Sequence, residues 1–364
     1  MVYHALGLMS GSSLDGLDVV FAHFHEQGGE WSFQIEKASC YAYNESWEKR
    51  LRAAPSLSAF DYCQLHVDYG HYLGKQVNRF IEENNFQFQV GLIGSHGHTV
   101  FHSPSTGMTA QIGDGAALAA ETGLPVVNDL RAMDLALGGQ GAPIVPMGER
   151  TLFSDYSLLL NIGGIANITR SGNNYIAFDI CPANRVLNLL AARLGKSFDE
   201  NGSIAATGKV VPALLSQLSA HPFYSQAYPK SLANEMGTEE HFPLLLSSGN
   251  SIEDLLATYT SHVAIQIAQQ ARALVADQPE VTHKMLVTGG GALNQHLLSL
   301  IQEQLSNTTI EVIQPDPTLI QYKEALIMAF LAVLRWRQEN TTIASVTGAQ
   351  RASIGGALWN GQDA

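Results

Sequence analysis

The residues best suited to chemistry stand in glycine-rich turns. The first turn follows an apolar run near the N-terminus and reads Gly7-Leu8-Met9-Ser10-Gly11-Ser12-Ser13-Leu14-Asp15-Gly16-Leu17-Asp18. Glycines let the backbone approach a polyphosphate, and free amide and hydroxyl groups then donate hydrogen bonds to its oxygens. Asp15 and Asp18 could hold Mg²⁺ beside the phosphates, directly or through water. The alternative is an ordinary tight hairpin whose serines satisfy the backbone.

The same arrangement recurs further along the chain. Leu158-Leu159-Leu160 leads into Asn161-Ile162-Gly163-Gly164-Ile165-Ala166-Asn167, and an apolar run resumes. Two such turns in matching positions favour phosphate binding and indicate an internal duplication. A third turn, Gly289-Gly290-Gly291-Ala292-Leu293-Asn294, precedes a helical pattern. It resembles a dinucleotide fingerprint with its third glycine replaced, although a turn that supports a nucleotide base or ribose fits it better.

Two acidic residues could act on a substrate. Asp179 ends a short apolar strand at 176–178, where a partly buried carboxylate could serve as a general base. Equally, it could cap a helix that starts near Ala183. Glu324 stands at the mouth of an apolar helix, where an unpaired charge is costly, so it either pairs with a neighbour or faces a ligand.

Basic and imidazole side chains follow two further strands. The strand at 126–128 ends in Asp129 and Arg131, and Arg131 could form a bidentate pair with a carboxylate of the substrate or of the protein. His96 and His98 follow the strand at 90–94. Zinc would require further ligands around the ion, so a substrate-contacting loop or a satisfied polar cluster is the favoured interpretation.

The elements that must position these residues alternate between strands and helices, which predicts an α/β fold. Hairpins are expected at 3–24 and 158–169, and amphipathic or buried helices at 60–80, 251–274, 293–305 and 321–338. Ser251 is expected to cap the second of these helices. Three glycines and two prolines in the segment 138–146 exclude regular structure there, so we expect the domain junction in it, with domains 1–140 and 141–364.

Composition narrows the class of protein. The 364 residues carry a formal charge of −13, which argues against non-specific nucleic-acid binding. The longest apolar run, 325–334, is about half the length of a membrane-spanning helix and predicts a buried core helix. Three scattered cysteines and an N-terminus without a secretory pattern predict a cytoplasmic protein that does not associate with a membrane.

Together these motifs resemble the anhydro-N-acetylmuramic acid kinases, a family within the ASKHA superfamily of sugar kinases, Hsp70 and actin. The N-terminal turn and the segment 138–146 are the most specific blocks. Further blocks occur in the family's order and cover nearly the whole chain: 95–100, Gln111 to Gly115, 129–131, 161–167, 178–179, 229–231, 254–258, 289–294, 324–325 and 346–349.

The resemblance implies a two-domain ASKHA fold of the actin-like, ribonuclease H-like type, with duplicated mixed sheets and an inter-domain cleft for ATP and an amino sugar. The implied reaction opens the anhydro ring of 1,6-anhydro-N-acetylmuramic acid with water and transfers the γ-phosphoryl of ATP to the 6-hydroxyl, in cell-wall recycling. The resemblance implies a homodimer, and Mg²⁺ is expected at Asp15 and Asp18, directly or through water.

The implied site residues fall into three groups. Asp179 is the catalytic base. The ATP-binding residues are Gly11, Ser12, Ser13, Leu14, Asp15, Gly16, Leu17, Asp18, Gly163, Gly164, Gly289, Gly290, Gly291 and Asn294. The sugar-binding residues are His96, His98, Gln111, Asp129, Arg131, Lys230 and Glu324.

The chain departs from the family pattern at three blocks. The usual Gly-Thr-Ser is Gly11-Ser12-Ser13, which keeps the hydroxyl. The usual Thr-Gly-Pro-Gly-Asn is Ile180-Cys181-Pro182-Ala183-Asn184, and the usual Lys-Ser-Thr-Gly-Arg-Glu is Lys230-Ser231-Leu232-Ala233-Asn234-Glu235, which lacks a basic residue. These departures leave open a kinase for another amino sugar. Two further alternatives stay open beside it: a non-catalytic or chaperone-like ATP-binding module, and a dinucleotide enzyme that uses the turn at 289–294.

Overall fold

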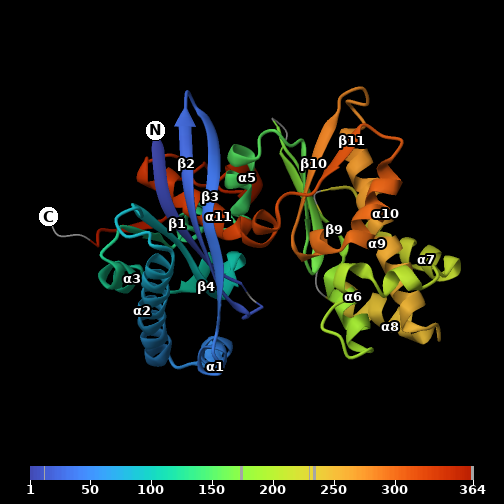
Figure 1. The fold of residues 1–364 in the computed structure, drawn as a ribbon, viewed down its shortest axis with the longest axis horizontal. Helices are drawn as coiled ribbons and strands as arrows, with labels where there is room; N and C mark the ends of the chain where they lie inside the picture. Colours follow the sequence, from blue (N-terminus) through green and yellow to red (C-terminus); the bar gives the residue numbers. More distant parts are fainter. Residues whose placement is uncertain (12, 173–174, 229, 233–234, 362–364) are drawn as a thin grey trace. The chain divides into compact units, whose positions relative to one another are not determined.

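The computed structural model describes residues 1–11, 13–172, 175–228, 230–232 and 235–361, which form two compact units (Figure 1). Unit 1 comprises Met1–Phe153 and Tyr322–Ala364, and unit 2 comprises Ser154–Gln321. This division differs from the expected domains 1–140 and 141–364, because the C-terminal segment belongs to unit 1.

Unit 1 is built on a mixed sheet. Its strands are β1 (Val2–Ser10), β2 (Gly16–Gln27), β3 (Glu30–Ala42), β4 (Leu92–Ser103), β5 (Met108–Ile112), β6 (Val126–Asn128) and β12 (Ala357–Trp359). They lie in the order β12-β6-β4-β1-β2-β3, and β5 pairs with β4. β1, β2 and β3 are antiparallel, whereas β4 is parallel to β1 and to β6. The predicted N-terminal hairpin is therefore confirmed.

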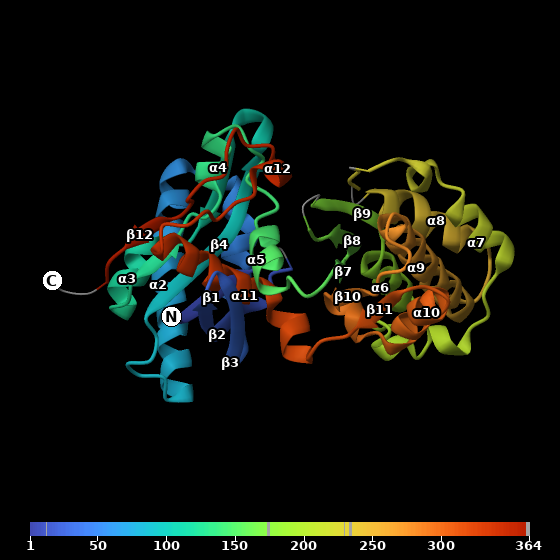
Figure 2. The same ribbon diagram turned by 90° about the horizontal axis from the view of Figure 1, so that it is seen from above.

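Helices flank this sheet. They are α1 (Glu45–Ala53), α2 (Ala59–Asn84), α3 (Gly115–Thr122), α4 (Ala132–Ala136), α5 (Val145–Leu152), α11 (Pro317–Trp336) and α12 (Ala344–Thr347). α2 and α3 lie side by side (Figure 2). Ser58 caps α2 by accepting a hydrogen bond from the Asp61 amide, which sets the start of the helix predicted at 60–80.

α11 is the core helix of unit 1. A Cβ atom on Gly7 would lie 1.8 Å from the Ala325 carbonyl oxygen, and one on Gly94 would lie 2.2 Å from that of Met328. Only glycine therefore lets the helix rest directly on β1 and β4. By length and composition α11 is the one described helix that could cross a membrane, but 67% of its most apolar stretch is buried in the protein, as the sequence predicts.

The C-terminal segment is held in unit 1 by specific contacts. β12 pairs with β6, and the buried Asp134 carboxylate accepts hydrogen bonds from the Gly141 amide at 2.8 Å and the Thr347 hydroxyl at 2.7 Å. The segment 138–146 is therefore a part of unit 1 tied to the C-terminal segment, and is not the junction. Its last two residues begin α5, because Pro146 is tolerated in the first turn of a helix.

Unit 2 repeats the topology of unit 1. Its strands are β7 (Leu158–Ile162), β8 (Ile165–Arg170), β9 (Ile176–Pro182), β10 (His283–Thr288) and β11 (Ile310–Ile313), and its helices are α6 (Asn184–Ala192), α7 (Pro212–Ser219), α8 (Phe242–Ser247), α9 (Ile252–Val275) and α10 (Gln295–Leu305). The order β11-β10-β7-β8-β9 has the same directions as β6-β4-β1-β2-β3 of unit 1. The predicted α/β fold of the ASKHA type, with duplicated mixed sheets, is confirmed.

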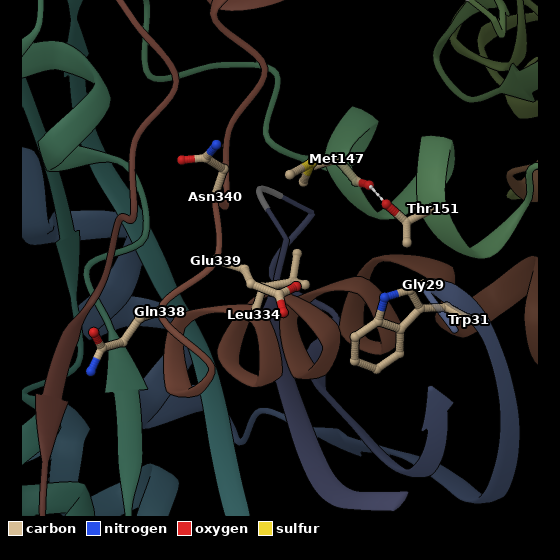
Figure 3. A pocket seen from close by; sticks show the side chains of 8 residues that line it. All are labelled: Gly29, Trp31, Met147, Thr151, Leu334, Gln338, Glu339 and Asn340. Atoms are coloured by element: carbon tan, nitrogen blue, oxygen red, sulfur yellow. Dashed lines mark hydrogen bonds between the residues drawn. The ribbon is translucent and has the colours of Figure 1, made fainter. Parts of the chain in front are cut away.

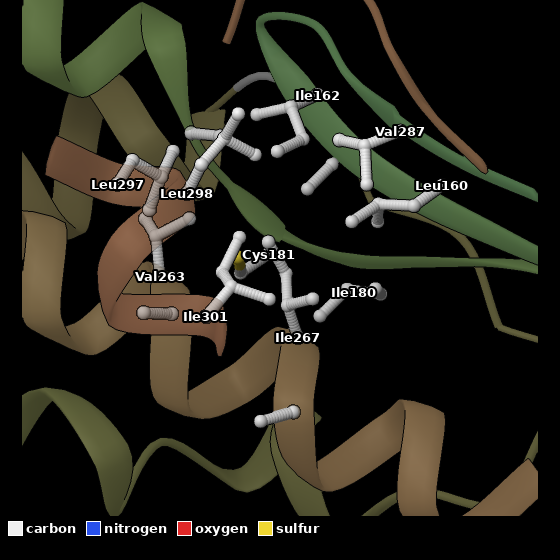
Figure 4. Packing of buried hydrophobic residues seen from close by; sticks show 14 of the residues in the cluster. Leu160, Ile162, Ile180, Cys181, Val263, Ile267, Val287, Leu297, Leu298 and Ile301 are labelled. Carbon is white, nitrogen blue, oxygen red and sulfur yellow. The ribbon is translucent and has the colours of Figure 1, made fainter. Parts of the chain in front are cut away.

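The core of unit 2 lies between its sheet and two long helices. Figure 4 shows side chains of β7, β9 and β10 facing those of α9 and α10. Ser251 caps α9 through the Asp254 amide at 3.2 Å, and Asn294 caps α10 through the Leu297 amide at 2.9 Å. The Ser251 cap and the apolar stripes of both helices are as predicted, whereas the Asn294 cap was not predicted.

Candidate active site

The N-terminal turn joins β1 to β2. Ser13 donates to an Asp15 carboxylate oxygen at 2.7 Å, so this serine satisfies a side chain and not the backbone, unlike in a plain hairpin. Leu14 adopts a left-handed conformation with φ of 60°. Leu17 is buried in the unit 1 core, so it can contribute to the turn only through its backbone. Ser12 lies outside the described residues.

Asp18 is the most perturbed carboxylate of this turn. Burial, together with the charges of Asp15 and Glu324, raises its pKa to about 6, although a hydrogen bond from Cys40 opposes the shift. Cys40 stands opposite Asp18 in the register of β2 and β3. This partner was not predicted, because only the register of two strands brings it to Asp18. Glu324 is exposed, and its side chain makes no hydrogen bond or ion pair with another described residue.

The residue beside Glu324 is paired. Lys323 donates to Glu149 at 2.6 Å, and both side chains are nearly buried. This pair links α11 to α5 within unit 1. Of the two alternatives for Glu324, pairing with a neighbour is therefore wrong for the described residues, and a ligand-facing carboxylate stays a proposal.

His96 and His98 have separate partners. His96 Nε2 accepts from Arg131 Nε at 2.9 Å, so its Nδ1 carries the proton and donates to the Gly97 carbonyl at 3.0 Å. Burial and the charge of Arg131 lower the pKa of His96 to about 3, which keeps the ring neutral. His98 Nδ1 lies 3.1 Å from Ser10 Oγ. Among the described residues no group of three or more His, Cys, Asp or Glu could hold a metal ion.

Arg131 keeps its charge without a directly paired carboxylate among the described residues. Besides His96, it donates to the Gly141 carbonyl at 2.7 Å, and Glu324 acts on it only as a nearby charge. Asp129 has a φ of 53°, and its carboxylate accepts from the Ala132 amide. Partial burial raises the pKa of Asp129.

Gln111 offers a buried acceptor. Its amide nitrogen donates to Thr109 at 2.8 Å and to Thr99 at 3.2 Å, while its Oε1 is buried and has no partner among the described residues. A buried acceptor without a donor is costly unless a ligand supplies one. Gln111 thus has an acceptor oxygen, and Arg131 a charged guanidinium, that could each bind a polar ligand.

Asp179 lies on β9 in unit 2. Its Oδ2 accepts from the Leu232 amide at 2.9 Å, and no hydrogen bond reaches its Oδ1 from the described residues. Burial raises the pKa of Asp179. Its role as the cap of the next helix is wrong, because Ala183 occupies the cap position of α6 and no side chain caps that helix.

Lys230 holds Asp179 through its backbone. Its carbonyl accepts from the Asp179 amide at 3.1 Å, while its buried ammonium donates to the Phe223 carbonyl at 3.2 Å and lies 4.6 Å from the Phe223 ring centre. Burial lowers the pKa of Lys230. The expected role of the Lys230 side chain in sugar binding is therefore corrected, because its ammonium faces the protein. Asn234, in the block that lacks a basic residue, lies outside the described residues.

A buried network behind Asp179 was also not predicted. The Tyr259 hydroxyl donates to the Pro182 carbonyl at 2.9 Å, so His241 Nδ1, at 3.0 Å, must donate to Tyr259. Burial lowers the pKa of His241 to about 4, which keeps the ring neutral. His241 ends a π-helix at Met236–His241, and no local sequence signal marks such a helix.

The glycine turns of unit 2 serve different purposes. Gly163 and Gly164 line a pocket of about 540 Å³, together with Asn184, Arg185, Asn188, Leu189 and Thr238. The turn at Gly289–Gly291 does not line it. A Cβ on Gly291 would lie 2.2 Å from Ile162 Cγ2, and one on Gly289 would lie 2.6 Å from Asn161 Oδ1. These glycines are therefore required by packing against β7, and Asn294 is occupied as the cap of α10.

A separate pocket of about 420 Å³ lies in unit 1 (Figure 3). Its lining consists of Gly29, Trp31, Met147, Thr151, Leu334, Gln338, Glu339 and Asn340. None of the predicted site residues is among them, so this pocket is not a candidate for the same chemistry.

Comparison with known proteins identifies the family. The model of the family described as anhydro-N-acetylmuramic acid kinase matches residues 3–361 of the chain. Proteins of that name from Bacillus cereus (strain AH820) and Bacillus anthracis (strain CDC 684 / NRRL 3495) are each 33% identical to the chain, over 96% of it and 97% of their own length. Among solved structures, the activator of the 2-hydroxyisocaproyl-CoA dehydratase from Clostridium difficile with bound ADPNP is 15% identical at a TM-score of 0.45, over 90% of this chain and 94% of that one. The chain belongs to the anhydro-N-acetylmuramic acid kinase family.

Proposed function

We propose that the chain uses ATP and water to convert 1,6-anhydro-N-acetylmuramic acid into N-acetylmuramic acid 6-phosphate and ADP, as a step in cell-wall recycling, with Asp179 as the general base. Family membership over 96% of the chain supports the reaction. The observation that carries the residue assignment is Asp179 itself: one carboxylate oxygen is fixed by an amide, the other has no described partner, and its pKa is raised. Such a carboxylate is suited to accept a proton near neutral pH.

The proposed reaction joins attack of water on the anomeric carbon to transfer of a phosphoryl group. Asp179 Oδ1 takes a proton from a water molecule whose oxygen forms a bond to the anomeric carbon. The bond between that carbon and the bridging oxygen breaks, and the electron pair stays on the oxygen at position 6. That oxygen then bonds to the γ-phosphorus of ATP while the bond between this phosphorus and the β–γ bridging oxygen breaks. ADP leaves with that electron pair, and Asp179 releases its proton to solvent.

The N-terminal turn fits a magnesium nucleotide. Mg²⁺ is commonly held by one or two carboxylates plus the phosphates of its substrate, often through water. Asp15 and Asp18 provide two carboxylates in one turn, and a bound cation would offset the burial and the neighbouring negative charges that raise the pKa of Asp18. When bound, Mg²⁺ neutralises charge on the phosphates.

Arg131 and Gln111 support recognition of the sugar. Muramic acid carries a lactyl carboxylate, and Arg131 is a cation without a directly paired carboxylate among the described residues. Gln111 Oε1 can accept a hydrogen bond from a sugar hydroxyl or amide group. We propose that His98, Asp129 and Glu324 complete the polar surface for the sugar.

Two further properties are part of the proposal. The free thiols of Cys40, Cys63 and Cys181 support a reducing compartment, hence the cytoplasm. A homodimer is expected from the family. Light scattering on the purified chain should give twice 39.3 kDa for a dimer, and the single-chain mass would refute it.

The test is ADP release from the purified chain with 1,6-anhydro-N-acetylmuramic acid, compared with other anhydro and open amino sugars. Asp179→Asn should lower turnover by about 10²- to 10⁴-fold while ADP binding is kept, because it removes the base only. Asp155→Asn, which removes a charge at an exposed position of unit 2, is the matched control. Turnover no faster than in buffer with every sugar, or full activity of Asp179→Asn, would overturn the proposal.

A further inference from the structure

The pocket beside Gly163 and Gly164 contains a cation that no sequence motif identifies. Arg185 lines this pocket from the first turn of α6, and its side chain is exposed. Its guanidinium makes no hydrogen bond or ion pair with another described residue, and only the Arg185 backbone amide is paired, with the Gly164 carbonyl at 3.4 Å. By contrast, Arg170 of the same unit pairs with Asp277 at 2.9 Å.

The glycine turn and α6 satisfy each other's backbone. The Gly164 carbonyl accepts from the Ala183 amide at 2.8 Å, and the Gly163 carbonyl accepts from the Asn184 amide at 3.1 Å. The first amides of α6 are thus occupied, and the helix offers few donors to a ligand. Any positive charge for an anion in this pocket must come from a side chain.

Arg185 is placed to provide that charge. A Cβ atom on Gly164 would lie 3.7 Å from Arg185 Nε and 3.8 Å from its Nη2. The guanidinium therefore lies across the space that the absent side chain of Gly164 leaves open. The Gly164 amide donates to no other backbone group among the described residues, so an amide and a guanidinium are both available at one turn.

We propose that Arg185 binds the phosphate groups of the nucleotide at the Gly163-Gly164 turn and thereby favours nucleoside di- and triphosphates over nucleosides. The inference rests on the proposed function, since it takes ATP as the ligand. Its chemical basis is that a guanidinium donates two parallel hydrogen bonds to phosphate oxygens and keeps its charge at every physiological pH. In a chain with a charge of −13, attraction of a polyanion must be local.

The experiment measures binding of ADP and of adenosine by calorimetry, without sugar, to the full-length chain and to Arg185→Met, Arg185→Lys and Arg193→Met. Arg193 is exposed at the end of the same helix and does not line the pocket, so its variant controls for the loss of one charge. Arg185→Met should raise the Kd of ADP about tenfold or more and leave that of adenosine unchanged. Arg185→Lys should retain part of the affinity, and Arg193→Met all of it.

The other results of the binding experiment overturn the role of Arg185, the proposed function or both. If Arg185→Met binds ADP as tightly as the unchanged chain, the inference is wrong whatever the kinase assay gives. If adenosine is weakened as much as ADP, Arg185 contacts the base and not the phosphates, which also overturns it. ADP binding that needs Arg185 in a chain without sugar-dependent turnover would refute the proposed function alone, and no ADP binding at all would refute both.

Discussion

The surroundings of Asp18 disfavour the ionised form of its carboxylate. Its folded-state pKa of about 6 lies above the ordinary value of 3.8, so folding favours the protonated form. The stability that this group contributes is fully present below about pH 3.8 and is lost as the pH rises through about 6. At neutral pH the ionised carboxylate therefore costs stability, and the cation that we propose at this turn would offset that cost.

Replacing that carboxylate should reveal the cost. Asp18→Asn should raise the melting temperature relative to the unchanged chain by an amount that grows between about pH 4 and pH 6 and is constant above, and it should weaken binding of Mg-ATP. Thermal unfolding across this pH range is the measurement. Glu30→Gln, an exposed change on the neighbouring strand, should show no such pH dependence. A difference in melting temperature that is already complete at pH 4 would contradict the raised pKa of Asp18.

How far the site residues could be predicted depends on what fixes each one. The Gly163-Gly164 turn stands between two strands, which an apolar pattern marks directly, whereas Asp179 lies inside β9 and not at the expected strand end, because the pairing of β9 with β8 continues to Pro182. Lys230 could not be assigned correctly, because its burial against Phe223 depends on a loop with no periodic signal. Arg185 was missed because a single cation in the first turn of an amphipathic helix looks like any exposed residue until the adjoining turn is known.

At the scale of elements, β9 positions Asp179, and the end of this strand is held from behind. Tyr259 on α9 donates to Pro182, the last residue of β9, and accepts from His241. All three are buried, so each polar atom depends on the others. The orientation of the strand end thus depends on two buried side chains, one on α9 and one at the end of the π-helix.

Removing one hydroxyl should test this dependence. Tyr259→Phe leaves the His241 Nδ1 donor without its acceptor and should lower the free energy of unfolding by about 1–3 kcal/mol. It should also lower kcat more than it raises the KM for the sugar, since Asp179 is misplaced. Tyr228→Phe, which alters an exposed ring stacked on Phe178, should change neither. Denaturant unfolding and steady-state kinetics supply both readings, and an unchanged unfolding free energy for Tyr259→Phe would argue against the network.

Long elements were predictable from the sequence and short ones were not. α2, α9 and α10 have apolar stripes and polar N-caps that set their type and approximate ends, and α11 is apolar along most of its length. β12 has three residues, and its partner β6 is more than two hundred residues away in the sequence. A strand of that length has no pattern of its own, because tertiary pairing decides its structure.

At the scale of the whole molecule, the two units share a topology but differ in how the chain builds them. Unit 2 is one continuous segment with its own apolar core, and this core includes Ile320. Unit 1 needs two segments, because α11 rests on Gly7 and Gly94 and β12 covers the edge of β6. The expected boundary at 140 failed for this reason: the duplication is visible in the sequence, but the return of the chain to unit 1 is not.

This difference predicts unequal behaviour of fragments. Residues 154–321 expressed alone should fold, because they retain a complete sheet and the helices that bury it. Residues 1–153 alone should not, since loss of α11 exposes the apolar face of the sheet and loss of β12 leaves an edge strand open to aggregation. A chain that joins 1–153 to 322–364 through a flexible linker should regain a cooperative transition. Circular dichroism and thermal unfolding of the three proteins measure this, and a cooperative transition in 1–153 alone would show that α11 is dispensable for unit 1.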